Sequence, residues 1–459
     1  MLTEIFQRFV KASPISVMVG GLLNRVFCPD ALDGLFEQNA QRQYTKELLF
    51  STLFDLMSQV VCGIRRSVHA AYQASLEEIA VSITSVYNKL NATETGLSAA
   101  LVRYSAAQLA PITRGLDGAL EPLLPGFRVK IIDGNCIEAS QHRIEELRYT
   151  KAGALPGKSL VVYDPSLKLV LEVYPCEDGY TQERALLGGV FSGVEAGDLW
   201  MADRNFCTRR FFFGLADRGG FFLIREHKQV PWRALSSLAK VGEVDTGIVY
   251  EQVVSIESDG GQVLVLRRVV LDLYEPTRDG ETEIALLSTV PSQAANGCVL
   301  AEVYRRRWTI EGAFQELAEH LSSEINTLGY PRAALFGFCV GVVVWNVLSV
   351  VQAALRSVHG TKKIEEEVSG YYIADEIAGT YRGMMIAIPL ESWTLFRWMT
   401  SVELVGVLQD LASQVRLSAF KKHPRGPKKK PPRRRSNKQE PHVSTARLIA
   451  QRWARNQTP

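Results

Sequence analysis

Apolar positions along the first 120 residues follow helical spacing. KELLFSTLFDLMSQVVCGI (46–64) is apolar at helical intervals, and SLEEIAVSITSVYNKL (75–90) begins with a serine and paired glutamates. Acidic residues in the first turn are typical of a helix N-terminus. We therefore predict an all-helical N-terminal domain over residues 1–120.

The pattern changes to strands near residue 127. Strands are predicted over FRVKIIDGNCIE (127–138), a hairpin at 158–164 and 168–175, and further strands at 198–206 and 221–227. Helices are predicted between them at 181–191 and 208–219. Three strands followed by alternating helices and strands indicate an α/β (α+β) fold with a mixed five-stranded sheet and flanking helices.

A second β-rich stretch interrupts this core. VYEQVVSI (249–256) and QVLVLRRVVLDLY (262–274) flank SDGG, a strong signal for a short hairpin. A helix is predicted from about 299. We expect a core domain over 121–228 and 299–360, which a β-rich insertion over 229–298 interrupts. A helical region over 361–420 and a basic tail over 421–459 follow.

The net charge of +3 conceals a local concentration of positive charge. Residues 421–438 hold ten Lys/Arg and no acids, which leaves 42 basic against 49 acidic residues elsewhere, a formal charge of −7. Such a run predicts either contact with a polyanion, without sequence readout, or a solvated tail. We favour DNA contact, with Lys428, Lys429, Arg433 and Arg434 as candidates.

Cysteine usage and hydropathy indicate the compartment. The seven cysteines are scattered with no CxxC pair, which argues against a zinc ribbon or a disulfide framework and fits a reducing cytoplasm. The N-terminus is a poor signal peptide. The apolar run 333–355 includes Asn346, Ser349 and Gln352, so we predict a buried core helix and no membrane span.

Three acids at distant positions are candidates for chemistry. Asp133 ends the first core strand in IIDG, and Asp203 ends the fourth in MADR. A buried acid is costly unless it is paired or metal-bound, although a strand-terminal Asp also serves as a turn or cap residue. In YRRRWTIEGAF (304–314), helical spacing places Tyr304, Arg307 and Glu311 on one face. The alternative is an ordinary surface ion pair between Arg307 and Glu311.

Carboxylates gathered from separate elements repel one another unless cations neutralise them. Mg²⁺ favours oxygen ligands, and two such ions about 4 Å apart could act on both sides of a phosphodiester. Arginines beside them could hold phosphates through bidentate hydrogen bonds. The pattern therefore favours metal-dependent phosphoryl transfer.

The spacing Tyr304-x2-Arg307-x3-Glu311 resembles the Y-x2-R-x3-E-x6-K signature of the DDE-type bacterial insertion-sequence transposases. That family has a ribonuclease-H-like core whose element order is similar to the one predicted here. The resemblance implies that Asp133, Asp203 and Glu311 are the catalytic, metal-binding triad. It also implies that Tyr304 and Arg307 contact DNA phosphates.

The resemblance further implies a DNA transposase that nicks transposon ends by hydrolysis and then transfers the freed strand into target DNA. The expected cofactor is a pair of Mg²⁺ ions, for which Mn²⁺ can substitute. The expected partners are double-stranded terminal inverted repeats and target DNA, bound by a homodimer on paired ends in the bacterial cytoplasm, associated with the nucleoid. The N-terminal helical domain would then bind the DNA end.

This chain departs from the signature at one position, where Ala318 replaces the lysine. Arg305 and Arg306 are further DNA-contact candidates from another face of the helix. Trp232 is a candidate for stacking on a flipped base, with packing as the alternative. Two other functions stay open: a ribonuclease-H-like nuclease without strand transfer, and a DNA-binding derivative that has lost catalysis.

Overall fold

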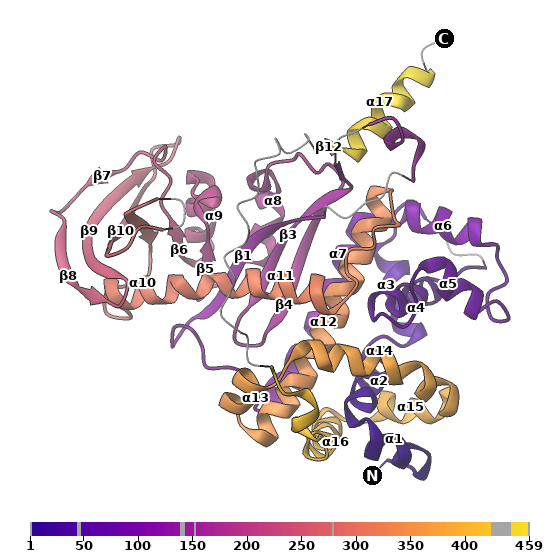
Figure 1. Cartoon of the computed structure of the whole chain (residues 1–459). Helices are drawn as coiled ribbons and strands as arrows, with labels where there is room; N and C mark the ends of the chain where they lie inside the picture. The colour runs from indigo at the N-terminus through magenta and orange to yellow at the C-terminus, as the bar shows by residue number, and fades with distance from the viewer. Residues whose placement is uncertain are drawn as a thin grey trace.

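The computed structural model of the chain describes residues 2–43, 47–137, 143–150, 153–277, 280–423 and 442–457. In this part of the chain, helices form the two ends of the sequence and a mixed sheet forms the middle (Figure 1). The mixed α/β class that the hydrophobic pattern predicts is confirmed.

Five strands form the first half of the sheet in the order β4-β3-β1-β5-β6. They are β1 (Arg128–Ile137), β3 (Gly157–Asp164), β4 (Leu169–Cys176), β5 (Asp198–Ala202) and β6 (Phe221–Arg225). β1 pairs antiparallel with β3 and parallel with β5, so it lies at the centre of this half. The predicted order of three strands followed by alternating helical segments and strands in a mixed sheet is therefore present.

The β-rich insertion continues the same sheet. Its strand β11 (Glu283–Ser288) pairs antiparallel with β6, and the order continues through β10 (Val263–Leu273) and β9 (Gly247–Glu257) to β7 (Arg233–Ala234), with β8 (Ala239–Val244) also on β9. The result is a ten-stranded sheet, whereas the sequence analysis predicted a five-stranded sheet with a separate insertion. Hydropathy marks each strand but does not specify which edge it joins.

The region before the sheet is helical. Its elements are η1 (Glu4–Phe6), α1 (Gln7–Ala12), α2 (Pro14–Val26), α3 (Pro29–Asn39), α4 (Phe50–Val61), α5 (Val68–Ala74), α6 (Ile83–Ala92) and α7 (Thr95–Gly115). The helix predicted over 75–90 begins only at Ile83, because Ser82 caps it by accepting from the Ser85 backbone N–H. α7 packs against β4, so this region shares one core with the sheet.

The helix between β4 and β5 is shorter than predicted. Residues 181–191 contain η3 (Glu183–Leu186), α8 (Leu187–Val190) and the beginning of η4 (Phe191–Gly193). After β5 come η5 (Arg204–Phe206) and α9 (Arg209–Ala216). These elements cover one face of the sheet, where Ile132 of β1 packs with Leu187 and Val190.

A long helical rod crosses the sheet after the insertion (Figure 1). It consists of α10 (Gly297–Arg305), a 3₁₀ turn η6 (Arg306–Trp308) and α11 (Thr309–His320). The remaining helices are α12 (Pro331–His359), α13 (Thr361–Glu367), α14 (Gly370–Ala387), α15 (Leu390–Trp398), α16 (Ser401–Ser413) and η7 (Leu417–Phe420).

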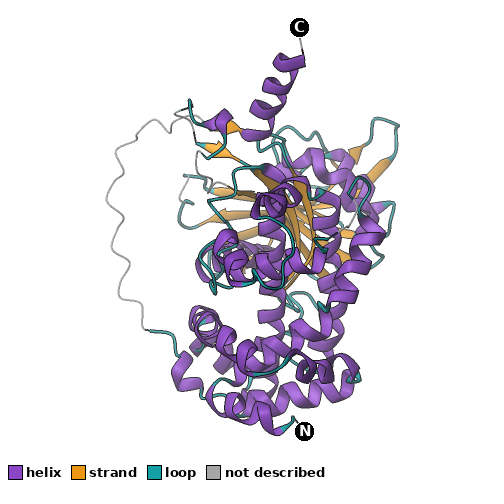
Figure 2. Ribbon diagram, turned by 90° about the vertical axis from the view of Figure 1, so that its right-hand side faces the viewer, coloured by secondary structure: helices purple, strands orange, loops and turns teal. Residues whose placement is uncertain are grey.

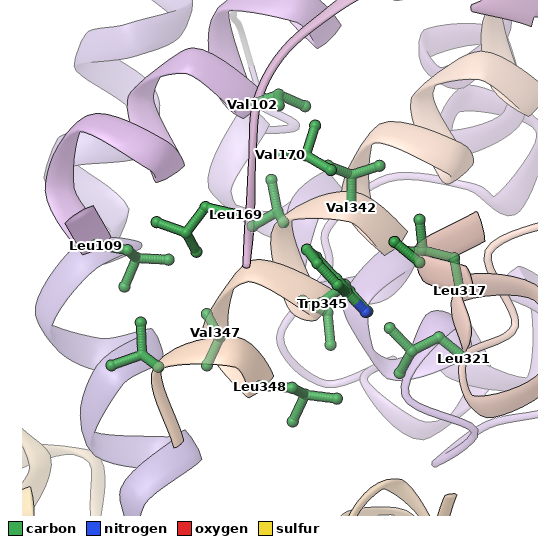
Figure 3. Packing of buried hydrophobic residues seen from close by; sticks show 14 of the residues in the cluster. Val102, Leu109, Leu169, Val170, Leu317, Leu321, Val342, Trp345, Val347 and Leu348 are labelled. Atoms are coloured by element: carbon green, nitrogen blue, oxygen red, sulfur yellow. The ribbon is translucent and has the colours of Figure 1, made fainter. Parts of the chain in front are cut away.

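α12 is long and apolar enough to cross a membrane, but its most apolar stretch is completely buried inside the protein. Figure 3 shows its residues Val342, Trp345 and Val347 packed among side chains of α7, α11 and β4. Asn346 is fully buried in this core. Its side chain bonds both backbone groups of Val170 at 2.9 Å and donates to Ser105 Oγ at 3.0 Å. These bonds offset the cost of burying an amide.

The end of the chain returns to the sheet domain (Figure 2). β12 (Val443–Ser444) pairs parallel with β2 (Ala154–Leu155), and α17 (Thr445–Gln457) packs on η2 (Glu145–Leu147). Leu448 and Ile449 contact the small apolar cluster of Ile144, Leu147 and Ala154. The prediction of a basic tail over all of 421–459 does not include this docked helix. A helix this short and polar carries little hydrophobic signal.

Candidate catalytic site

Asp133 and Asp203 lie at the same level of two adjacent parallel strands. β1 and β5 pair in register, with Ile131 opposite Met201. Asp203 is the residue immediately after β5, as predicted, whereas Asp133 is two residues beyond the Ile131–Met201 pair and lies within β1, which continues to Ile137 because it keeps pairing with β3. The prediction that Asp133 ends its strand is therefore wrong. Because adjacent strands lie about 4.8 Å apart, this register brings the two carboxylates to one end of the sheet.

Arg307 links Asp133 of β1 to the helical rod. Its guanidinium donates to Asp133 Oδ2 at 2.8 Å and to Glu311 Oε1 at 3.1 Å. The Arg307 side chain is 8% exposed, whereas that of Glu311 is 49% exposed. The pair of Arg307 and Glu311 is therefore not an ordinary surface ion pair. Its arginine is buried and also contacts Asp133.

Tyr304 lies close to Arg307 and contacts the last residue of β5. Its side chain is buried, and its hydroxyl donates to the carbonyl oxygen of Ala202 at 3.3 Å. Burial raises the pKa of Tyr304 to about 12, with nearby Arg307 acting in the opposite direction. Tyr304 is therefore a neutral group that holds the rod against the end of β5.

The pKa of Asp133 shows how crowded this end of the sheet is. Burial raises it from 3.8 to about 6, although Arg307 and the Gly134 backbone N–H oppose the rise. The charges of Asp203 and Glu183 raise it further. Asp203 itself caps η5, because its Oδ1 accepts from the Asn205 backbone N–H at 2.8 Å. Asp133, Asp203 and Glu183 thus lie within electrostatic reach of one another, and the Arg307 guanidinium contacts Asp133 directly.

In the part of the chain that the structure describes, no three acid, histidine or cysteine side chains are close enough to hold a metal ion together. The donor set nevertheless fits a hard cation, because Asp133 and Asp203 supply oxygen ligands at matching positions along the adjacent strands β1 and β5. The Arg307 guanidinium contacts both Asp133 and Glu311 and supplies the positive charge between them. A bound cation would replace that charge.

Sequence analysis missed Glu183, a fourth acid at this site. Glu183 begins η3, and its carboxylate lies over Gly134, where an added Cβ would be 2.1 Å from Glu183 Oε1. Burial raises the pKa of Glu183, and the charge of Asp203 adds to the rise. The sequence contains only a weak signal for this contact. Position 134 after Asp133 is a glycine, and Glu183 lies in a polar stretch that looks like many others on a protein surface.

A cavity of about 650 Å³ opens next to Glu183. Four of the residues that line it carry a full positive charge, and they come from β3, η3, η5 and α9: Lys158, Arg184, Arg204 and Arg209. Glu183 and Asp259 are the acids among its lining residues. The cavity is therefore a net positive recess, which sequence spacing alone did not reveal.

The other predicted DNA-contact residues lie in different surroundings. Arg305 and Arg306 are exposed on the rod, and Ala318 is exposed further along it. Trp232 donates from Nε1 to Glu226 Oε1 at 2.7 Å, and the Arg268 guanidinium lies 5.0 Å from its ring centroid.

Lys428, Lys429, Arg433 and Arg434 lie outside the described residues. The basic-tail prediction is therefore untested at all four positions.

Part of this chain matches a known protein family. Residues 125–336 match the model of the transposase DDE domain, whereas no curated protein matches the chain. The matched segment begins just before β1 and ends within α12, so it includes the insertion, Asp133, Asp203 and Glu311. Transposases with this domain act on DNA and typically use divalent metals. Residues 125–336 are therefore similar to a transposase DDE domain, which supports a DDE-type insertion-sequence transposase.

Proposed function

We propose that this transposase hydrolyses phosphodiesters at the ends of its mobile element and joins the freed strand to target DNA, with Asp133, Asp203 and Glu311 as the catalytic acids. The observation that carries the proposal is their arrangement. Two acids come from adjacent parallel strands, and the third reaches one of them through a shared guanidinium. Acids brought together in this way are costly to the fold and are characteristic of functional sites.

The acids are proposed to bind two divalent cations, Mg²⁺ or Mn²⁺. When bound, such cations activate the attacking oxygen and stabilise the leaving oxygen of an in-line displacement. Asp133 and Asp203 supply ligands from the rigid sheet, and Glu311 supplies one from the first turn of α11. Its half-exposed side chain can rearrange more readily than those of the strand acids.

Arg307 has two roles in this proposal. Without cations it neutralises Asp133 and Glu311. Once cations take over that role, its planar guanidinium can donate to a DNA phosphate next to the scissile bond. Tyr304 acts as a positioning residue, because its hydroxyl ties the rod to Ala202 beside Asp203.

The positive recess next to Glu183 extends the DNA path away from the acids. Lys158, Arg184, Arg204 and Arg209 would hold backbone phosphates there without reading sequence. Arg305 and Arg306 would contact DNA from the exposed side of the rod, and the basic run 421–438 would add non-specific affinity. Trp232 is the proposed stacking platform in the insertion, provided that a base can replace its contact with Arg268.

The test uses purified protein, Mg²⁺ and a plasmid that carries the inverted repeats flanking the gene. Joined products support transposition. Cuts without joining support the nuclease alternative, and a mobility shift without cutting supports an inactive DNA-binding derivative. Light scattering of the protein with and without repeat duplexes tests for the proposed homodimer on paired ends.

A further inference from the structure

We propose that Glu183 is a fourth metal-binding carboxylate of the catalytic site and reaches the cations from the face of the sheet opposite to α12. The inference rests on the proposed function, because it assigns a new ligand to the same cations. It concerns a residue outside the Asp133, Asp203 and Glu311 set.

Glu183 reaches the strand end through a gap that glycine leaves. Ile131 packs with the α12 core, whereas Ile132 packs with Leu187 and Val190 on the other face. Side chains alternate along a strand, so Asp133 shares the face of Ile131, and position 134 shares the face on which η3 and α8 lie. Because residue 134 is glycine, the Glu183 carboxylate occupies the space that a Cβ there would fill.

Asn205 connects Glu183 to the second strand acid. The Asn205 backbone N–H donates to Asp203 Oδ1 at 2.8 Å, and the Asn205 side chain acts to lower the pKa of Glu183. The charge of Asp203 raises the pKa of Glu183, and the charge of Glu183 raises that of Asp133. Glu183 therefore lies within electrostatic reach of both aspartates.

The alternative role for Glu183 is to neutralise the basic residues of the recess. Among the described residues no Lys or Arg forms an ion pair with Glu183, although the charge of Lys158 acts to lower the pKa of Glu183. A counterion for Lys158, Arg184 or Arg204 would be expected to contact one of them. Its contact with Asn205 and its position over Gly134 instead direct the carboxylate toward the strand acids.

The experiment measures thermal stabilisation of the full chain by Mn²⁺ without DNA, together with Mn²⁺ binding by electron paramagnetic resonance. The variants are Glu183→Gln, Glu183→Asp, Asp133→Asn and Asp203→Asn. Glu195→Gln is the matched control, because Glu195 is an exposed acid before β5 that pairs with Arg128. Melting in EDTA shows whether each variant is folded.

We expect Glu183→Gln to weaken Mn²⁺ binding by about 10- to 100-fold, the range for residues that support a metal site. Glu195→Gln should bind like the wild type, and Glu183→Asp should fall in between. Gly134→Ala should mimic Glu183→Gln, and combining the two should add little because both displace one carboxylate.

Two other outcomes separate the inference from the proposed function. If Asp133→Asn and Asp203→Asn lose Mn²⁺ binding while Glu183→Gln keeps it, Glu183 is not a ligand but the proposed site stands. If the wild type does not bind Mn²⁺, or if neither aspartate variant weakens binding, the proposed metal site is wrong and the assignment of Glu183 fails with it.

Discussion

The guanidinium of Arg307 donates to the carboxylate of Asp133 at 2.8 Å across 174 residues of sequence. The same group donates to Glu311, so one buried cation joins the central strand to the rod. Arg307 thereby neutralises acids that burial would otherwise disfavour as charged groups.

We expect Arg307→Ala to destabilise the metal-free protein. It leaves Asp133 without its cationic partner, and breaking a buried pair costs about 3–5 kcal/mol. Mg²⁺ should restore more stability to the variant than it adds to the wild type, because the cation replaces the lost charge. Urea unfolding with EDTA and with Mg²⁺ measures both effects.

Arg305→Ala provides the control, since Arg305 is exposed on the same rod. Its stability should change by less than about 0.5 kcal/mol. Equal responses of the two variants to Mg²⁺ would contradict the role assigned to Arg307.

Replacing the proposed catalytic acids should abolish chemistry but leave DNA binding. Asp133→Asn, Asp203→Asn and Glu311→Gln should each reduce nicking of the inverted-repeat plasmid by more than about 100-fold, because each loses a metal ligand. Gel shifts should change little, since phosphate contacts come from other residues. Glu319→Gln on the exposed side of α11 is the control. Full activity in any one acid variant would remove that residue from the set.

The raised pKa of Asp133 predicts a specific pH dependence of stability. In the unfolded chain the carboxyl ionises near 3.8, and in the metal-free fold near 6. The native state therefore binds more protons between these values, so stability should fall as pH rises through this window. Relative to Asp133→Asn, the wild type should lose on the order of 2–3 kcal/mol between pH 4 and pH 7.

Urea unfolding in EDTA measures this difference. A wild-type curve parallel to that of Asp133→Asn over this pH range would show that Asp133 is not perturbed. Mg²⁺ affinity should show the opposite trend and weaken below about pH 6, because the cation binds the ionised carboxylate.

Asn346 should be a major determinant of stability. Asn346→Ala removes a side chain that bonds both backbone groups of Val170, which leaves buried polar groups of β4 without partners. We expect a loss of about 2–4 kcal/mol in the free energy of unfolding. Ser349→Ala on the same helix removes only a bond within α12 and should cost less than about 1.5 kcal/mol.

The docked C-terminal helix can be tested with a pair of neighbouring substitutions. Ile449→Asp places a charge against the cluster of Ile144, Leu147 and Ala154 and should detach α17. Hydrogen exchange should then speed up in residues 143–150 and 153–155. Ala450→Asp, on the exposed side, should leave exchange unchanged. Equal protection in both variants would show that the helix does not shield this segment.

The sequence predicted most elements of the core, because short apolar runs such as 158–164 and turn signals such as SDGG are local properties. It was less accurate where tertiary contacts decide. Residues 181–191 form a 3₁₀ segment and a short α-helix in place of one longer helix, and the pairing of β11 with β6 depends on an edge that no local pattern marks. α17 is held by contacts with residues about 300 positions earlier in the chain, such as the bond from Arg452 to Glu146.

The candidate site was likewise predictable only in part. The chain by itself determined which acids follow apolar strand segments and which arginine lies one helical turn before Glu311, since these follow from spacing. Only the tertiary structure decided that Arg307 turns inward between Asp133 and Glu311 and that Glu183 approaches across Gly134. Strand register and the packing of the rod on the sheet set these contacts, and both are sums of long-range interactions that no short stretch of sequence contains.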